Sequence, residues 1–333
     1  MTLRPAHILL SLTLLLASCS LSIGSNEEAQ GEEMEIVRFD RAQEAYLAAP
    51  SFPAWQTLVT VYPRETRILV EDELKLGSLD DESISDSLAL FFADSTLVTL
   101  CADVDSAYAD VTTLSKDLAK VFEALRSEYP EAGTPRVYTQ ISALNQSIVV
   151  GDSIIGISLD KYLGADYPLY QRYYNAGQRL SMTKGHIVPD VLNFYLNYLF
   201  PPTKKERTLS RVMIHMGKFH WAVSRLMQLS LLSEVTPDHH THKSYAAAEA
   251  ATWRELSRPE VLHTTDSATI VSYMAFQPDT PHGAKSVPER IGVWIGMRIV
   301  DAYMRKHKDV TLTDLLRDDD AEKIIRESGY SPV

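Results

Sequence analysis

Residues 148–159 read Ile-Val-Val-Gly-Asp-Ser-Ile-Ile-Gly-Ile-Ser-Leu and carry the strongest strand signal in the chain. β-Branched residues fill both halves of this stretch, and Gly151-Asp152-Ser153 between them is a turn sequence, so the pattern predicts a β-hairpin. Val137–Ile141, a short distance upstream, has the same β-rich character and predicts another strand. We therefore expect a small sheet that ends in a hairpin.

The sequence before this sheet predicts helices. From Arg41 to Arg126 the apolar residues recur at mixed spacings of three and four, for example across Ile84–Val98. The clearest helical stripe precedes Pro130, which ends it, and consists of Leu114, Leu118, Val121, Phe122 and Leu125. A short sheet among many helices places the chain in the α+β class, predominantly helical.

Helical patterns also follow the sheet. Val191–Phe200 is apolar on most sides and stops at Pro201, and Leu209–Met227 carries an apolar stripe at a spacing of 3.6. Ser286 and Glu289 have capping-box spacing, which predicts the start of another helix there. A second capping box, Thr311 with Asp314, predicts a short closing helix.

The helix expected after Pro288 is apolar on every side from Ile291 to Tyr303. A helix without a polar face belongs inside the protein, so we expect a buried central helix near the C-terminus. Gly292 and Gly296 are four residues apart and lie on one face of this helix. Because glycine has no Cβ, this face allows another backbone to approach closely.

The N-terminus predicts a bacterial lipoprotein signal. Leu16-Ala17-Ser18-Cys19 follows the apolar run Ile8–Leu16, which is too short to span a bilayer and is typical of a signal peptide. The alternative is an ordinary secretory signal with a chance cysteine. We predict a signal peptide over residues 1–18, lipidation of Cys19, an acidic flexible tether over 19–35 and a single globular domain over 36–333. Ser20 after the anchor, rather than aspartate, favours the outer membrane.

Composition excludes several classes of function. The chain has 333 residues and a formal net charge of −12, so we expect no nucleic-acid partner and no electrostatic adhesion to anionic lipid. Membrane contact should come through the lipid anchor. With Cys19 lipidated, Cys101 has no disulfide partner within the chain and is expected to be a buried apolar side chain; a reactive thiol is the alternative.

No catalytic, cofactor-binding or metal-binding residue is predicted from motifs. The chain lacks His-Glu-x-x-His, Gly-x-Ser-x-Gly and a phosphate-binding Gly-Lys-Ser/Thr loop. His215 and His220 are five residues apart, roughly 140° on one helix, so one helix cannot direct both to one zinc ion. We expect His220 to be a hydrogen-bonded core residue and His215 to lie on a flank. The tract His239–His242 is interpreted as a loop at a helix N-terminus, with Asp238 as its cap.

The second half of the chain resembles the gliding motility lipoprotein GldB family of Bacteroidota, which is similar to predicted zinc-dependent proteases. The main match is Pro-Glu-Arg-Ile-Gly-Val-Trp-Ile-Gly at 288–296, continuing through Ile299-Val300 and Tyr303-Met304. The other matches stand in the same order along the chain and are Leu159–Gly164, Gly217-Lys218, Glu249 with Trp253, and Ser328 with Tyr330 and Pro332. The resemblance covers Val137–Pro332.

The resemblance implies a zincin-like scaffold. In active relatives a third zinc ligand is a glutamate on a later helix, often followed by glycine, but Met216 precedes Gly217 here. The resemblance therefore implies a pseudoenzyme without cofactor, which supports gliding motility or type IX secretion by binding cell-envelope proteins around the Gly217-Lys218 and Trp294 helices. One alternative is an active metallopeptidase that uses His186, His215 or His220 with a distant glutamate. Another is a lipoprotein that binds a peptide or glycan in a vestigial cleft.

Overall fold

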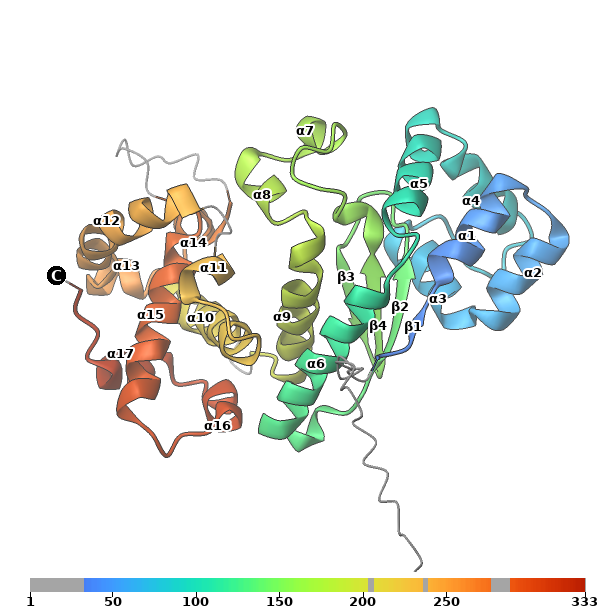
Figure 1. Ribbon diagram of the computed structural model, residues 1–333. Helices are drawn as coiled ribbons and strands as arrows, with labels where there is room; N and C mark the ends of the chain where they lie inside the picture. The colour runs from blue at the N-terminus through green and yellow to red at the C-terminus, as the bar shows by residue number, and fades with distance from the viewer. Residues whose placement is uncertain (1–32, 203–206, 236–238, 277–287, 333) are drawn as a thin grey trace, which may run out of the picture. The chain divides into compact units, whose positions relative to one another are not determined.

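The computed structural model describes residues 33–202, 207–235, 239–276 and 288–332, without the side chains of 239–241. These residues contain one four-stranded sheet of order β1-β2-β4-β3 (Figure 1). Its strands are β1 (Ile36–Val37), β2 (Arg136–Gln140), β3 (Ile148–Gly151) and β4 (Ile154–Ser158). β3 and β4 pair antiparallel, with Val150 opposite Ile155, so the predicted hairpin is confirmed.

The remaining pairs of strands are parallel. β1 pairs with β2, and β2 pairs with β4 in a register that sets Tyr138 beside Gly156. A Cβ placed on Gly156 would lie 2.8 Å from Cε1 of Tyr138, so this glycine leaves the space that the buried tyrosine ring occupies. The sequence does not predict β1, because two residues are too few to show an alternating pattern.

Helices make up most of the rest, so the predicted class, α+β and predominantly helical, is confirmed. Before the sheet lie α1 (Phe39–Ala48), α2 (Phe52–Val61), α3 (Pro63–Arg67), the π-helical η1 (Ile68–Glu73), α4 (Ile84–Phe92), α5 (Ser95–Ala107), α6 (Thr112–Glu128) and the 3-10 turn η2 (Pro130–Ala132). The helical segment Ile84–Val98 is broken, because Asp94 accepts a hydrogen bond from the Thr96 amide and caps a new helix. In the described part of the chain no single helix has the length and apolarity of a membrane span; only α4 and α5 together do, and they are bent by 84°.

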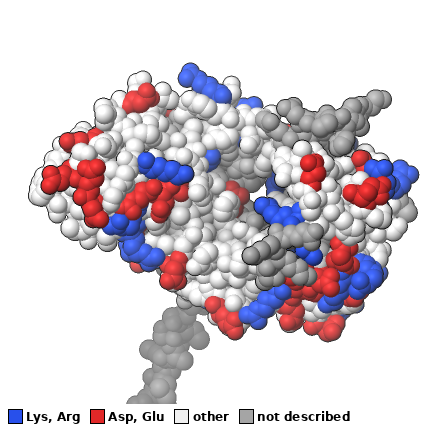
Figure 2. All heavy atoms as spheres, turned by 180° about the vertical axis from the view of Figure 1, so that it is seen from behind, with Lys and Arg blue, Asp and Glu red and all other residues white. Residues whose placement is uncertain are grey.

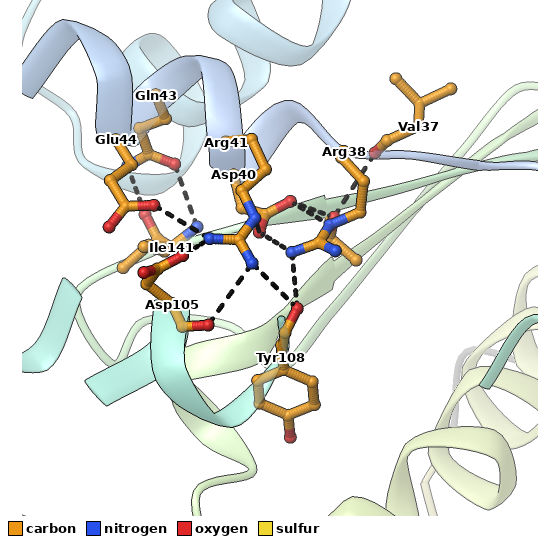
Figure 3. Close-up of polar contacts among 10 residues, drawn as sticks. Val37, Arg38, Asp40, Arg41, Gln43, Glu44, Asp105, Tyr108 and Ile141 are labelled. Carbon is orange, nitrogen blue, oxygen red and sulfur yellow. Dashed lines mark hydrogen bonds and ion pairs between the residues drawn. The ribbon is translucent and has the colours of Figure 1, made fainter. Parts of the chain in front are cut away.

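The junction between β1 and α1 is held by charged and polar side chains (Figure 3). Arg38 donates two hydrogen bonds to Asp40, at 2.9 and 2.7 Å, and a third to the Tyr108 carbonyl. Asp40 is buried and also accepts from the hydroxyl of Thr139 on β2. Gln43 exchanges two hydrogen bonds with the backbone of Ile141. These contacts fix α1 against the end of β2.

The elements after the sheet begin with short turns and one long helix. They are η3 (Leu159–Lys161), α7 (Tyr170–Tyr173), α8 (Ala176–Leu180), η4 (Lys184–His186), α9 (Ile187–Leu199), α10 (Leu209–Leu226), α11 (Leu231–Val235), α12 (His239–Leu256), α13 (Pro259–Leu262), α14 (Ser267–Met274), α15 (Ile291–Lys306), α16 (Leu312–Arg317) and α17 (Ala321–Ser328). α9 contacts β3 and β4 as well as α10, and in Figure 1 it lies between the sheet and the later helices.

α15 is the buried helix that the sequence predicts. Ile291–Met297 is buried without interruption, and α10 is its main neighbour. A Cβ on Gly296 would come within 3.0 Å of the Met213 backbone, so the prediction that this glycine face admits another backbone is confirmed at Gly296. Gly217 of α10 contributes to the same close approach of the two helices, because a Cβ there would lie 2.8 Å from the Met297 amide nitrogen.

Two predicted helix starts are wrong. α15 begins at Ile291 rather than near Ser286, which lies outside the described residues, because Arg290 has a left-handed backbone with φ 55°. A left-handed residue cannot continue a right-handed helix backward. The tract His239–His242 is not a loop but the first turn of α12; Asp238 lies outside the described residues. The capping box of Thr311 with Asp314 is confirmed at the start of α16.

A cleft between α9 and α10 as the candidate functional site

The described residues line a cavity of about 1050 Å³ between α9 and α10. The ends of α11 and α15 close part of it, through Glu234 and Arg290. This size is in the range of small-molecule and peptide sites, which usually combine apolar walls with a few convergent polar groups. His186, His215 and His220, the three histidines considered as metal ligands, all line this one cavity.

One face of α9 supplies polar groups to the cavity. Asp190, Asn193 and Asn197 all line it, and their spacings of three and four residues place them on the same side of the helix. Sequence reasoning missed these residues, because the pattern that identifies α9 is its apolar one. The signal was present as three polar residues at helical spacing in an otherwise apolar segment.

Asparagine–histidine hydrogen bonds join α9 to α10. His215 Nε2 lies 3.0 Å from Oδ1 of Asn197, and Nδ2 of Asn193 lies 3.2 Å from Nε2 of His220. Burial lowers the pKa of His215 to about 4, so this imidazole is neutral at pH 7. The prediction that His220 is a hydrogen-bonded core residue is confirmed, since it is also 8% exposed.

His220 is held between a carboxyl group and a guanidinium. Its Nδ1 lies 2.8 Å from Oε1 of Glu234, and its Nε2 lies 2.7 Å from Nη2 of Arg290. Because a guanidinium can only donate, Nε2 must accept, and the ring proton is on Nδ1 and is donated to Glu234. Burial lowers the pKa of His220, with a further contribution from Arg290. The chain therefore runs from Arg290 through a neutral imidazole to Glu234.

This set of side chains does not fit a zinc site. Both ring nitrogens of His220 are engaged, and the cation of Arg290 stands at the nitrogen that would otherwise be open to a metal. On α9, Pro189, Asp190 and Asn193 have the spacing of a His-Glu-x-x-His motif, but proline and asparagine are not zinc ligands of the usual kind. The described residues contain no group of three His, Cys, Asp or Glu side chains placed to hold a metal ion.

Two further residues singled out in the sequence have structural positions. Lys218 is 2% exposed, and its ammonium donates to the backbone carbonyls of Leu316 and Asp318. Burial lowers the pKa of Lys218 to about 8. Cys101 is buried, and burial raises the pKa of its thiol to about 12. A thiol with this pKa stays protonated at neutral pH, which argues against the reactive-thiol alternative.

Several residues that carry the family resemblance meet around Glu249 of α12. Its carboxylate accepts hydrogen bonds from Trp294 Nε1 at 2.9 Å, Arg298 Nε at 3.1 Å and the Tyr330 hydroxyl at 2.6 Å. The ring of Trp253 packs edge-on against Tyr330. These contacts join α12, α15 and the C-terminal segment, so Glu249, Trp294 and Tyr330 hold helices together near the cleft and do not line it.

Asp190 should make stability depend on pH. Burial raises the pKa of this carboxyl group from 3.8 to about 6, although the hydrogen bond from Tyr162 lowers it. The folded state therefore holds the proton more tightly, and the contribution of Asp190 to stability is lost as the pH rises through about 6. We expect Asp190→Asn to gain stability relative to wild type between pH 4 and 7, by about 2 kcal/mol. Urea unfolding at several pH values in this range measures the difference in unfolding free energy between variant and wild type. For the control Phe194→Leu, which removes no ionisable group, this difference should not change with pH. A pH-independent difference for Asp190→Asn would contradict the raised pKa.

Comparison with known proteins gives one result. The family model described as "Gliding motility protein GldB" matches residues 24–332, which is nearly the whole chain. No curated protein and no solved structure matches. The match includes every helix that lines the cleft.

Proposed function

Because the chain belongs to the gliding motility protein GldB family, we propose that it is a non-catalytic lipoprotein, anchored in the outer membrane through Cys19. In this proposal it supports gliding motility, type IX secretion or both by binding other envelope proteins. Its globular part retains the arrangement of a peptidase-like cleft without the metal. Cys19 and most of the acidic tether lie outside the described residues, so the anchor rests on the sequence Leu16-Ala17-Ser18-Cys19 and on family membership.

One observation carries the non-catalytic part of the proposal. His220, one of the candidate metal ligands, donates to Glu234 and accepts from Arg290, so neither of its ring nitrogens is open to a metal ion. Without a metal ion nothing in the cleft would lower the pKa of water toward 7. Metal analysis of the purified full-length protein addresses this directly. Stoichiometric zinc that disappears in His220→Ala would favour the divergent metallopeptidase and contradict the proposal.

We propose that partners bind the surface around the helices that carry Gly217-Lys218 and Trp294. Gly217, Lys218 and Trp294 are buried, so their helices cannot offer these residues to another protein. Instead α9 exposes Phe194 and Tyr198, one turn apart and 43% and 45% exposed, and Phe194 lines the cleft. On the face in Figure 2 acidic and basic side chains are interspersed, which favours a protein partner over nucleic acid.

Cys19→Ala tests the anchor and its importance. We expect the variant to lose palmitate labelling completely, to move from the membrane to the soluble fraction, and not to restore gliding in a deletion strain of the host. The folded domain begins after this residue, so its thermal unfolding should be unchanged. Cys101→Ala is the matched control and should keep the label. Restored gliding by unlabelled Cys19→Ala would show that anchoring is dispensable.

A further inference from the structure

Arg290 places an incompletely paired guanidinium in the wall of the cleft. Its Nη2 donates to His220, and its guanidinium carbon lies 4.7 Å from the centre of the Phe276 ring. A guanidinium has five N–H donors, and the described residues accept from it only through this one imidazole nitrogen. No carboxylate of the described residues forms an ion pair with Arg290 within 4.0 Å. A charge in such a position favours an anionic partner.

Two acidic groups of the cleft that interact electrostatically with Arg290 form their hydrogen bonds with other donors. Asp190 accepts a hydrogen bond from the Tyr162 hydroxyl at 2.8 Å. Glu234 accepts from His220, and burial raises its pKa well above the usual value, which reduces the negative charge it presents. The remaining donors of Arg290 are therefore not claimed by either group.

The backbone of Arg290 is an independent sign of a specialised position. Its φ of 55° and ψ of 26° are left-handed, a conformation that is costly for a residue with a long side chain. The Arg290 amide donates to the Ala275 carbonyl at 3.1 Å, which holds this turn at the start of α15. Strained residues that the surrounding structure maintains are concentrated at functional sites.

The wall of the cleft opposite α10 suits a peptide backbone. Asn193 uses its Nδ2 atom, toward Nε2 of His220, and Asn197 uses its Oδ1 atom in the hydrogen bonds to α10. Among the described residues, Oδ1 of Asn193 and Nδ2 of Asn197 have no hydrogen-bond partner. One acceptor and one donor thus stand a helical turn apart, next to the exposed ring of Phe194. A peptide group needs one of each, whereas the chain of a fatty acid needs neither.

We propose that the cleft binds the C-terminal segment of an extended peptide, with the terminal carboxylate on Arg290 and the preceding peptide groups on Asn193 and Asn197. The inference deepens the proposed function, since it names the ligand class of a cleft that binds without cleaving. Arginine suits this role, because its planar donors match the two oxygens of a carboxylate. The apolar walls would then hold the side chains of the terminal residues.

A library of random peptides tests the proposal without requiring that the sequence of the ligand be known. The purified full-length protein in dodecyl maltoside micelles is incubated with acetylated tetrapeptides of randomised sequence, prepared both as free acids and as C-terminal amides. Bound peptides are separated by gel filtration and counted by mass spectrometry. We expect the free acids to be enriched about tenfold over the amides, because the charge-assisted hydrogen bonds are lost in an amide.

Variants assign this preference to one residue. Arg290→Gln should reduce the enrichment to about onefold, whereas Arg207→Gln, which removes an exposed charge elsewhere on the same cleft, should leave it unchanged. If Arg290→Gln fails to fold, the comparison of acid and amide on the wild-type protein still decides. Equal binding of acids and amides, or no binding of either, would overturn the proposal. None of these results depends on gliding or anchoring, so failure here is distinct from failure of the proposed function.

Discussion

Replacing Gly296 with alanine should lower the free energy of unfolding by about 3 kcal/mol, at the upper end of the usual cost of overpacking. The new Cβ would come within 3.0 Å of the carbonyl carbon and oxygen of Met213. Both atoms belong to the backbone of α10, so no side-chain rotation can relieve the contact. α10 and α15 would have to separate, and both contribute walls to the cleft or its surroundings.

Chemical unfolding of the full-length protein measures this effect. Gly185→Ala is the matched control, since a Cβ there would meet only the Thr183 hydroxyl at 4.0 Å, and its unfolding free energy should change by less than about 0.5 kcal/mol. Gly217→Ala should resemble Gly296→Ala, because its Cβ would lie 2.7 Å from the Gly296 carbonyl oxygen. A Gly296→Ala protein as stable as wild type would show that the two helices have room to spare.

Removing the carboxylate of Glu249 should cost a similar amount, about 3 kcal/mol, as expected when a buried charge loses its partner. Glu249→Ala would leave the guanidinium of Arg298, the indole N–H of Trp294 and the hydroxyl of Tyr330 without their shared acceptor. The indole N–H of Trp294 would be a buried donor without an acceptor, and the donors of Arg298 and Tyr330 are half-buried. The C-terminal segment should detach first, because Tyr330 is one of its contacts with α12.

Thermal unfolding and limited proteolysis of the C-terminus test this expectation together. Glu260→Ala removes a glutamate whose side chain is 68% exposed, and it should change stability by less than about 0.5 kcal/mol. Glu249→Gln keeps the shape and one acceptor and should fall between the two. Unaltered stability and protease resistance in Glu249→Ala would mean that the carboxylate of Glu249 is not needed to hold these helices together. Trp294 and Tyr330 would then have another role.

The parts of the fold that could be predicted are those with a local signal. Alternating β-branched residues around Gly151-Asp152-Ser153 indicate the hairpin, and the absence of a polar face identifies α15 as buried. The glycine at 296 also has a local signal, since only a residue without a Cβ allows a second helix backbone so close. Helix geometry predicts that His215 and His220 cannot share a ligand, and this agrees with their separate partners, Asn197 and Glu234.

The rest depends on contacts that sequence spacing does not contain. β1 forms only because β2, about a hundred residues later, offers its free edge. Glu234 reaches His220 because α11 turns back against α10, and no motif connects the two residues. The sequence pattern places Arg290 inside a helix, but its φ is positive and its amide donates a hydrogen bond to the Ala275 carbonyl. The centre of the cleft is therefore the least predictable part of the molecule.

The short strand β1 has a mechanical consequence. A force applied to the chain before residue 33 reaches the folded domain at this strand. It is resisted first by the two hydrogen bonds between Met34 and Ser115 and by the two-residue pairing of β1 with β2. The next contacts along the chain are the two hydrogen bonds from Arg38 to Asp40. With the proposed anchor at Cys19, these weak and then strong contacts would let the first residues yield under tension while the helices around the cleft keep their arrangement.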